Sequence, residues 1–273
     1  MVDKASEAKW DKEVDLLVLG SGAAGLSAAL TGVVEGLNVL LLEKSDYIGG
    51  TTAYSAGTIW IPNNHFQRED GITDDREKVE RYLDTLVGDK SDKQLRMAYV
   101  DQGPHMLKYM ENIGVEFLRS PNVVDYHSEL PETGKTGRAL EPKPFDGREL
   151  GKVNFAHVRP PVHEFALMNG TMMLRRPEAK VLLGLFSKLP KQTVAAVGTA
   201  LKLGMRWATD MVKYPRGTRL VMGNALTARM YHQVLTRGGD VWRNALTTEL
   251  IKEGNAVVGA VVNHGGVSHR IRV

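Results

Sequence analysis

The chain has 273 residues, of which 42% are hydrophobic and 25% are charged, and its formal net charge is +3. This composition is typical of a globular protein with one large domain or two smaller ones, and the lack of a basic block argues against nucleic acid as a partner. The chain contains no cysteine, which excludes disulfides, thiolate metal sites and cysteine nucleophiles, and which favours a reducing compartment such as the cytoplasm.

The first residues of the chain are polar and lack the apolar core of a signal peptide. Residues 1–12 are predicted to form a flexible tail. Residues 13–273 are predicted to form one domain.

The elements that follow the tail form a β-α-β unit. Val14–Leu19 and Val39–Leu42 are apolar runs of the kind found in buried parallel strands. Between them, Ala23–Glu35 has apolar residues at helical spacing, and Gly36 is well placed to end that helix. The unit predicts an α/β fold, namely a Rossmann-like domain with a parallel sheet and flanking helices.

The turn between the first strand and the helix reads Gly20-Ser21-Gly22-Ala23-Ala24-Gly25. In such a turn the first glycine permits the tight bend, the second lets the backbone approach a pyrophosphate, and the third lets helix and strand pack closely. The helix N-terminus presents N–H groups and a partial positive charge to the phosphates. Glu43 ends the second strand 18 residues after Gly25, where a carboxylate can accept hydrogen bonds from a ribose 2′-hydroxyl. Together these features predict an ADP-bearing dinucleotide.

Helices are predicted next along the chain. One is expected to begin at the capping residue Thr73, and a second at Lys93. Pro104 is expected to open a third helix that ends at Gly114. Residues 115–162 are rich in Pro, Gly and charge, and they predict long loops with short strands.

The last part of the chain is predicted to contain three helices followed by strands. The helices are expected at residues 178–189, 193–212 and 223–239. A strand over 240–245 precedes a hairpin that turns at Gly254–Asn255, and one more strand covers 268–273. These strands add a β-hairpin or meander to the parallel sheet.

The segment Ile48–Asn64, "IGGTTAYSAGTIWIPNN", follows the ribose acid directly. It predicts an ordered loop whose backbone N–H groups and hydroxyls can lie close to a planar cofactor. Together with "GSGAAGLSAAL" and "GNALTARMYHQVLTRGGDV", it resembles the large family of FAD-dependent enzymes that includes 3-ketosteroid dehydrogenases and the flavoprotein subunits of fumarate reductase and succinate dehydrogenase. The part "GGTTAYSAGTIWIP" looks closest to the 3-ketosteroid dehydrogenase branch.

This resemblance implies that FAD is the cofactor and that the loop runs along it from the ribose towards the flavin ring. Besides the three glycines of the turn and Glu43, the residues expected to contact FAD are Ala23, Ala24, Lys44, Gly50, Thr51, Thr52, Ser55, Ala56 and Gly57. Some relatives attach FAD covalently through a histidine in this loop, whereas Thr51 stands at about that place here. A dissociable, non-covalent FAD is therefore expected.

The segment Ser120–Leu150 also resembles the ketosteroid dehydrogenase branch, in which an Asp-Tyr pair precedes a Pro- and Gly-rich loop. The resemblance places Tyr126 in the substrate pocket over the flavin, as a catalytic residue. In a desolvated cleft a phenol can hydrogen-bond to a second acid–base group and lower its pKa. By chemistry alone Tyr126 would be a partly packed surface residue, and the neighbouring His127 is a competing candidate for proton transfer.

Two other kinds of site find no support in the sequence. His105, His157 and His163 match no metal-ligand spacing, so no metal is predicted. No nucleophile-elbow sequence is present, so a hydrolase is not supported.

The segment Val181–Val212 contains apolar clusters interrupted by lysines and an arginine. An amphipathic helix of this kind can lie on a membrane surface, but it can also pack against the rest of a fold with its cations pointing outward. Both interpretations remain open, and peripheral membrane contact is a possible addition to a cytoplasmic location.

The family resemblance predicts an activity and also its limits. In the family, hydrogens are removed from adjacent carbons of a steroid A-ring: a tyrosine takes a proton next to the ketone, and the flavin N5 takes a hydride. The expected partners are therefore a steroid or other ketone-bearing substrate and an electron acceptor. Relatives have longer chains with a separate catalytic domain, so this chain is expected to be an incomplete FAD-binding domain, inactive alone. The alternatives are fumarate reductase-like reduction of an unsaturated acid and a non-catalytic FAD-binding module.

Overall fold

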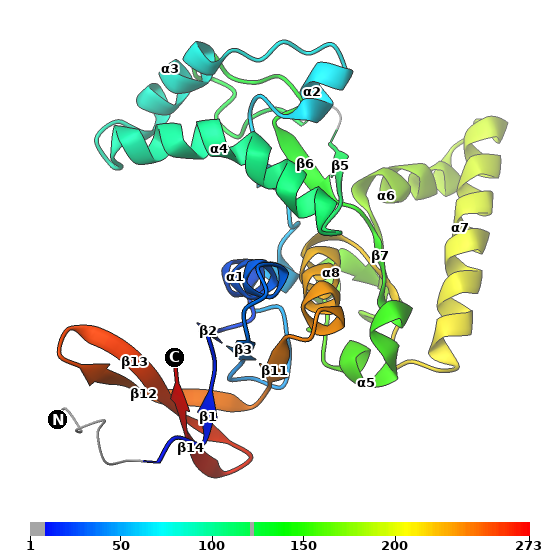
Figure 1. Ribbon diagram of the computed structural model, residues 1–273. Helices are drawn as coiled ribbons and strands as arrows, with labels where there is room; N and C mark the ends of the chain where they lie inside the picture. The colour runs from blue at the N-terminus through cyan, green and yellow to red at the C-terminus, as the bar shows by residue number, and fades with distance from the viewer. Residues whose placement is uncertain (1–8, 121–122) are drawn as a thin grey trace. The chain divides into compact units, whose positions relative to one another are not determined.

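The computed structural model describes residues 9–120 and 123–273 (Figure 1). These residues form two compact units. Unit 1 combines the segment that ends at Ser55 with Pro144–Val273, and unit 2 is the segment Ala56–Lys143 between them.

The centre of unit 1 is a three-stranded parallel sheet. Its strands are β2 (Leu16–Leu19), β3 (Val39–Leu42) and β11 (Asp240–Trp242), in the order β11-β3-β2. The helix α1 (Ala23–Val34) connects β2 to β3, so the predicted β-α-β unit is confirmed. Gly36 follows α1 with a φ of 81°, a left-handed conformation that suits the end of a helix.

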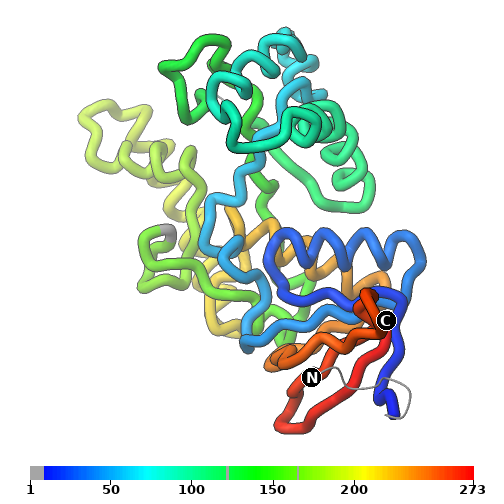
Figure 2. Tube along the Cα trace, turned by 90° about the vertical axis from the view of Figure 1, so that its left-hand side faces the viewer, coloured from blue at the N-terminus to red at the C-terminus, as the bar shows by residue number. Residues whose placement is uncertain are grey.

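A second, mainly antiparallel sheet covers one face of the parallel sheet. It contains β12 (Ala245–Glu253), β13 (Ala256–His264), β14 (Val267–Arg272) and the short strand β1 (Lys12–Glu13). Figure 2 shows α1 on one side of the parallel strands and the reddish strands of the second sheet on the other. The predicted hairpin at Gly254–Asn255 and the final strand are confirmed.

The alternation of side chains explains these layers. All four residues of β3 are buried, because both faces of the strand are covered. Leu40 and Leu42 join the core between the two sheets, which also contains Val14, Val262 and Ile271. Residues of a strand point alternately to its two faces. Val39 and Leu41 are therefore directed to the face on which α1 lies.

The chain before β2 is more ordered than the predicted tail. Lys12 in β1 pairs with Ile271 in β14, and the Asp11 N–H donates to the Arg270 carbonyl at 2.9 Å. The first eight residues of the predicted tail lie outside the described residues.

The helix α8 (Met222–Thr236) lies beside α1 in unit 1 (Figure 1) and has ten buried residues, which indicates that nearly its whole circumference is covered. The predicted helix at 223–239 is therefore confirmed, with an earlier end. The second segment of unit 1, Pro144–Val273, also contains smaller elements: β7 (Phe145–Asp146), η2 (Gly147–Leu150), α5 (Gly151–Ala156), η3 (His163–Phe165), β8 (Ala166–Leu167), β9 (Met172–Met173) and β10 (Arg219–Leu220).

The two helices expected near 178–212 are present with different boundaries. They are α6 (Arg176–Leu182), followed by a 3₁₀ turn η4 (Leu183–Phe186), and α7 (Pro190–Met211). The C-terminal end of α7 is held by Asp210, whose buried carboxylate accepts hydrogen bonds from the Thr218 N–H and from Arg148. Burial would raise the pKa of Asp210, but these hydrogen bonds outweigh it and hold the pKa below its ordinary value.

Unit 2 is built from three helices and a small antiparallel sheet. The helices are α2 (His65–Glu69), α3 (Arg76–Val87) and α4 (Lys93–Asn112), and the sheet has the order β4 (Ile59–Trp60), β6 (Ala139–Pro142), β5 (Phe117–Arg119). Between 115 and 162 the predicted loops and short strands are present, together with the helix α5, which was not predicted.

Two predicted helix starts in unit 2 are wrong. The helix α3 is capped by Asp75 and not by Thr73: the Asp75 carboxylate accepts a hydrogen bond from the Glu77 N–H at 2.9 Å. Pro104 does not open a helix but lies inside α4. Val100 and Leu107, on either side of this proline, are 1% and 0% exposed, so the burial of one helix face outweighs the cost of an internal proline.

Candidate cofactor site

The glycine turn of unit 1 has the geometry that its spacing predicts. Gly20 has a φ of 97°, a conformation that residues with a Cβ rarely adopt, and its N–H donates to the Leu42 carbonyl at 2.7 Å. A Cβ on Gly25 would lie 1.9 Å from the Gly20 carbonyl oxygen, so only glycine permits this approach of α1 to β2. A Cβ on Gly22 would meet nothing closer than the Thr52 hydroxyl at 3.8 Å. Gly22 is therefore not required by the packing of the turn.

Glu43 lies at the end of β3 and is 6% exposed. One carboxylate oxygen accepts hydrogen bonds from the Ser21 N–H at 3.1 Å and the Ser21 hydroxyl at 2.5 Å, and the other accepts one from the Ser45 N–H at 2.9 Å. Burial would raise the pKa of Glu43, but these hydrogen bonds outweigh it and hold the pKa below its ordinary value.

The loop after Glu43 is held against the glycine turn. The Gly49 N–H donates to the Ser21 hydroxyl at 3.0 Å, and the Ala23 N–H in the first turn of α1 donates to the Thr52 hydroxyl at 3.0 Å. A Cβ on Gly50, whose φ is 51°, would lie 3.2 Å from the Gly22 Cα. The loop, the turn and the start of α1 therefore form one surface.

Two residues of α8 hydrogen-bond with the backbone of this loop. The sequence analysis did not assign them to the site. The Gly223 N–H donates to the Ser55 carbonyl at 3.0 Å, and the Asn224 amide donates to the Ala53 carbonyl at 2.8 Å. A Cβ on Gly223 would lie 1.9 Å from the Thr52 carbonyl oxygen. The stretch "GNAL" contributed to the family resemblance, but nothing local to it indicates contact with a loop about 170 residues earlier.

Arg159 connects Ser45, just after Glu43, with Tyr54 in the loop. The sequence analysis did not assign it to the site. Its guanidinium donates to the Ser45 hydroxyl at 2.8 Å and to the Tyr54 hydroxyl at 3.3 Å. It also lies over the rings of Tyr47 and Tyr54, 5.8 and 5.5 Å from their centres.

The residues present fit an ADP-bearing dinucleotide. Gly22 leaves room for close approach, the first turn of α1 has N–H groups without intrahelical partners, and Glu43 places a carboxylate at the end of β3. Of the other predicted contacts, Ala24, Lys44, Thr51, Ser55 and Ala56 are exposed, Ala23 and Thr52 are half-buried, and Gly57 is buried. Ala56 and Gly57 belong to unit 2.

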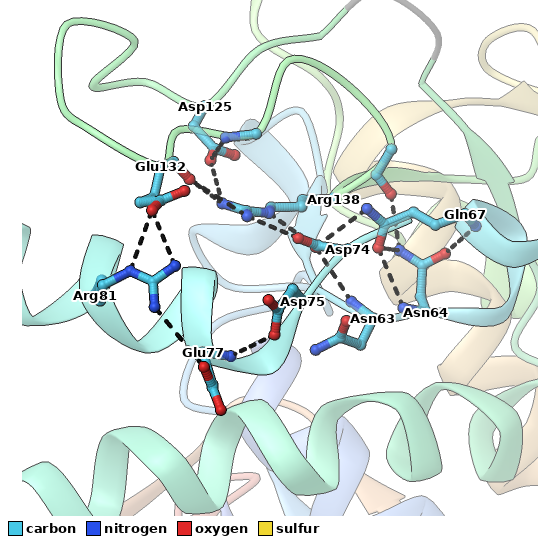
Figure 3. Close-up of polar contacts among 12 residues, drawn as sticks. Asn63, Asn64, Gln67, Asp74, Asp75, Glu77, Arg81, Asp125, Glu132 and Arg138 are labelled. Carbon is cyan, nitrogen blue, oxygen red and sulfur yellow. Dashed lines mark hydrogen bonds and ion pairs between the residues drawn. The ribbon is translucent and has the colours of Figure 1, made fainter. Parts of the chain in front are cut away.

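Tyr126, the predicted catalytic residue, lies in unit 2 with its side chain fully exposed. Its neighbour Asp125 is buried and bonded to Arg138 at 2.7 Å, and Figure 3 shows Arg138 between Asp125 and Asp74. The competing candidate His127 pairs with Glu129 at 3.1 Å.

Within residues 9–120 and 123–273, no group of His, Asp and Glu side chains is arranged to hold a metal ion. None of the helices in this part of the chain is long and apolar enough to cross a membrane.

The strand, glycine turn, helix and terminal acid define a dinucleotide-binding protein. Residues 15–273 match the family described as FAD binding domain, and the chain belongs to this family. Its cofactor is therefore FAD.

Three proteins similar to this chain are named as dehydrogenases. The chain is 35% identical to a 3-oxosteroid 1-dehydrogenase of Mycolicibacterium smegmatis over 92% of its own length, and 34% identical to a 4-oxocyclohex-2-ene-1-carboxylate 5-dehydrogenase of Sinomonas cyclohexanicum over 95%. A crystal structure of 3-ketosteroid delta1-dehydrogenase from Sterolibacterium denitrificans, in complex with 1,4-androstadiene-3,17-dione, matches 96% of the chain with a TM-score of 0.83 and 31% identity. The chain spans 42% of each of the two curated relatives and 46% of the crystallised chain.

Proposed function

We propose that this chain is the FAD-binding part of a dehydrogenase that forms a carbon–carbon double bond beside the ketone of a 3-ketosteroid A-ring. The observation that carries the proposal is the similarity, at 31–35% identity over more than nine-tenths of the chain, to enzymes named for desaturating cyclic ketones. The cofactor site described above supports it, because the glycine turn, the N-terminus of α1 and the buried carboxylate of Glu43 suit the nucleotide half of FAD.

The chain's own residues would contribute binding and proton chemistry. The first turn of α1 and the glycines would hold the diphosphate, and Glu43 would accept from the adenosine ribose. Bound FAD supplies the hydride acceptor, its N5 atom. Tyr126 would direct its phenol at the acid–base group that removes the proton next to the ketone, and would lower the pKa of that group by hydrogen bonding.

The test of the activity is anaerobic incubation of the full reading frame containing this chain with a 3-ketosteroid and a dye acceptor. Bleaching of the flavin followed by dye reduction is the expected result. Bound FAD without any turnover would instead support a non-catalytic module. Oxidation of the flavin, reduced beforehand, by an unsaturated dicarboxylic acid would support a fumarate reductase-like enzyme.

Monocyclic ketones are a second candidate substrate class, to be tested in the same assay with a dye acceptor. The 34% identical relative from Sinomonas cyclohexanicum is named for a cyclohexene carboxylate that carries a ketone. The ratio of kcat/KM for a 3-ketosteroid to that for 4-oxocyclohexanecarboxylate would decide between the two classes. We expect the steroid to be preferred.

We also propose that FAD is bound without a covalent link. Thr51 stands where some relatives carry the attaching histidine, and a threonine hydroxyl does not form that bond. Acid precipitation of the flavin-loaded protein should leave all yellow colour in the supernatant. Colour fixed to the precipitated polypeptide would contradict the proposal.

Peripheral membrane contact is proposed for α7 and the turn before it. The exposed apolar residues Val194, Val197, Leu201 and Met205 recur at intervals of three and four along α7, and Phe186 in η4 is 87% exposed. The only carboxylate between Ala179 and Lys213 is Asp210, which is buried and paired with arginines, so the exposed charges of this segment are cationic. An apolar stripe with a cationic rim fits an anionic lipid surface.

This membrane proposal predicts co-sedimentation with vesicles rich in phosphatidylglycerol, weakened by salt. Leu201→Glu should reduce the bound fraction at least about fivefold, since it places a carboxylate in the stripe. Val257→Glu is the matched control, because Val257 is an exposed apolar residue of β13 outside the stripe. Equal loss in both variants would contradict the assignment of the contact to α7.

A further inference from the structure

We propose that Asp125 is a positioning residue for the phenol of Tyr126, held in place by Arg138. This inference rests on the proposed function, in which Tyr126 is a catalytic residue. It concerns residues of unit 2 alone (Figure 3).

Asp125 is fixed by four hydrogen bonds. One carboxylate oxygen accepts from the Trp60 indole N–H at 2.6 Å, and the other from Arg138 at 2.7 Å and from the Gly134 N–H at 2.7 Å. The Asp125 N–H donates to the Gly134 carbonyl at 3.0 Å. Both the side chain and the backbone of Asp125 are therefore anchored.

The group that holds Asp125 is itself buried and doubly paired. The Arg138 side chain is 3% exposed and donates two parallel hydrogen bonds to Asp74, at 2.8 and 2.9 Å. Its guanidinium also lies 5.6 Å from the ring centres of Trp60 and Tyr82. A planar, permanently charged guanidinium with two carboxylate partners is a stiff support.

The residue on the other side of Tyr126 is anchored as well. The Leu130 N–H donates a hydrogen bond to the His127 carbonyl at 3.1 Å. Tyr126 thus lies between two anchored neighbours, while its own side chain is fully exposed. Because neighbouring Cα atoms are about 3.8 Å apart, fixing both neighbours restricts where the phenol can point.

Burying these charges costs free energy of folding, and a surface loop does not require that cost unless the position of the loop matters. Two aspartates and an arginine are withdrawn from water, and their mutual attraction does not always exceed the desolvation cost. The anchored loop presents one outward-facing phenol. Buried residues that hold the neighbour of a reactive group also keep that group close to the geometry that catalysis requires.

The experiment is a double-mutant cycle in the full reading frame that contains this chain. We expect Asp125→Asn to lower kcat at least about tenfold while KM changes less than about threefold. In the Tyr126→Phe background the same substitution should lower kcat less than about twofold, because the group that Asp125 positions is already absent.

Val100→Ala is the matched control, since it removes buried volume from α4, away from the loop. Its effect on kcat should be equal in both backgrounds, as expected for a purely structural change.

The possible failures differ from one another. Equal kcat losses for Asp125→Asn in both backgrounds would overturn the positioning role and leave Tyr126 as a catalytic residue. An unchanged kcat in Tyr126→Phe would overturn the role of Tyr126 and this inference with it, while steroid turnover by the parent protein would preserve the proposed activity. A lack of turnover with any ketone would overturn both.

Discussion

At the scale of single residues, the cofactor site depends on a buried carboxylate that is already hydrogen-bonded by Ser21 and Ser45. These hydrogen bonds outweigh burial, hold the pKa of Glu43 below its ordinary value and fix the direction of its carboxylate. Ser21 has a second task, because its hydroxyl also accepts from the Gly49 N–H. One serine therefore couples the ribose acid to the loop expected to run along FAD.

We expect Glu43→Gln to raise the Kd for FAD at least about tenfold, because a hydrogen bond to a charged acceptor contributes about 1.5–3 kcal/mol. The measurement is titration of the FAD-free protein, followed by flavin fluorescence. Glu253→Gln, at the exposed end of β12, is the control and should leave the Kd unchanged. An unchanged Kd for Glu43→Gln would contradict the role of Glu43.

Low pH should reduce the stability of the folded protein through protonation of Glu43. The folded-state pKa of Glu43 lies below the ordinary 4.5, so its ionised form stabilises the folded protein above pH 4.5, and this contribution is lost as pH falls from 4.5 through the folded-state pKa. Urea unfolding at pH 7 and pH 3.5 measures the loss. Glu43→Gln should show a smaller loss than the parent, and an equal loss would contradict the prediction.

Gly22 and Gly25 should respond differently to the same substitution. Gly25→Ala places a Cβ 1.9 Å from a carbonyl oxygen and should prevent the turn from forming, whereas Gly22→Ala meets only the Thr52 hydroxyl at 3.8 Å and should fold normally. If the backbone at Gly22 approaches the diphosphate, Gly22→Ala should still weaken FAD binding. Circular dichroism and FAD titration separate the two effects. Normal FAD binding by Gly22→Ala would contradict the approach at this position.

At the scale of elements, what the sequence could predict follows from how local each signal is. The β-α-β unit, α7, α8 and the β12–β13 hairpin were predicted because apolar spacing, glycine and turn residues act within a few positions. The start of α3 was misplaced because Thr73 and Asp75 are both capping residue types. The continuity of α4 through Pro104 was not predicted, because it depends on the burial of one face of the helix. The same limit applies to the site: Glu43 is part of a local pattern, but Asn224, Arg159 and Arg138 act on segments far away in the chain.

Pro104 gives a prediction about α4. An internal proline lacks the N–H for one helical hydrogen bond, which destabilises a helix by about 3 kcal/mol. Replacing proline by alanine also raises the conformational entropy of the unfolded chain, which lowers the stability by up to about 1 kcal/mol. Pro104→Ala should therefore stabilise unit 2 by about 2 kcal/mol, measured by urea unfolding. Gly103→Ala should gain less, because its Cβ would lie 3.3 Å from the Ile61 side chain. A loss of stability in Pro104→Ala would show that the proline fits a bend that the unit requires.

At the scale of the whole molecule, the division into two units predicts where FAD acts. The glycine turn, Glu43 and the loop up to Ser55 belong to unit 1. Ligand at about 100 times its Kd stabilises the part it binds by about 2.7 kcal/mol. Hydrogen exchange should therefore slow in α1 and β3 on addition of FAD, and much less in α4. Equal slowing in α4 would show that the two units unfold together.

The pairing of β1 with β14 has a consequence for synthesis on the ribosome. The Asp11–Arg270 contact joins residues 259 positions apart, so the sheet that contains it can close only when almost all of these residues have been translated. Unit 2 is a contiguous segment and can fold while the rest of unit 1 is still emerging. Until then, the side chains of β3 that face the second sheet would lack their cover and depend on chaperones for protection.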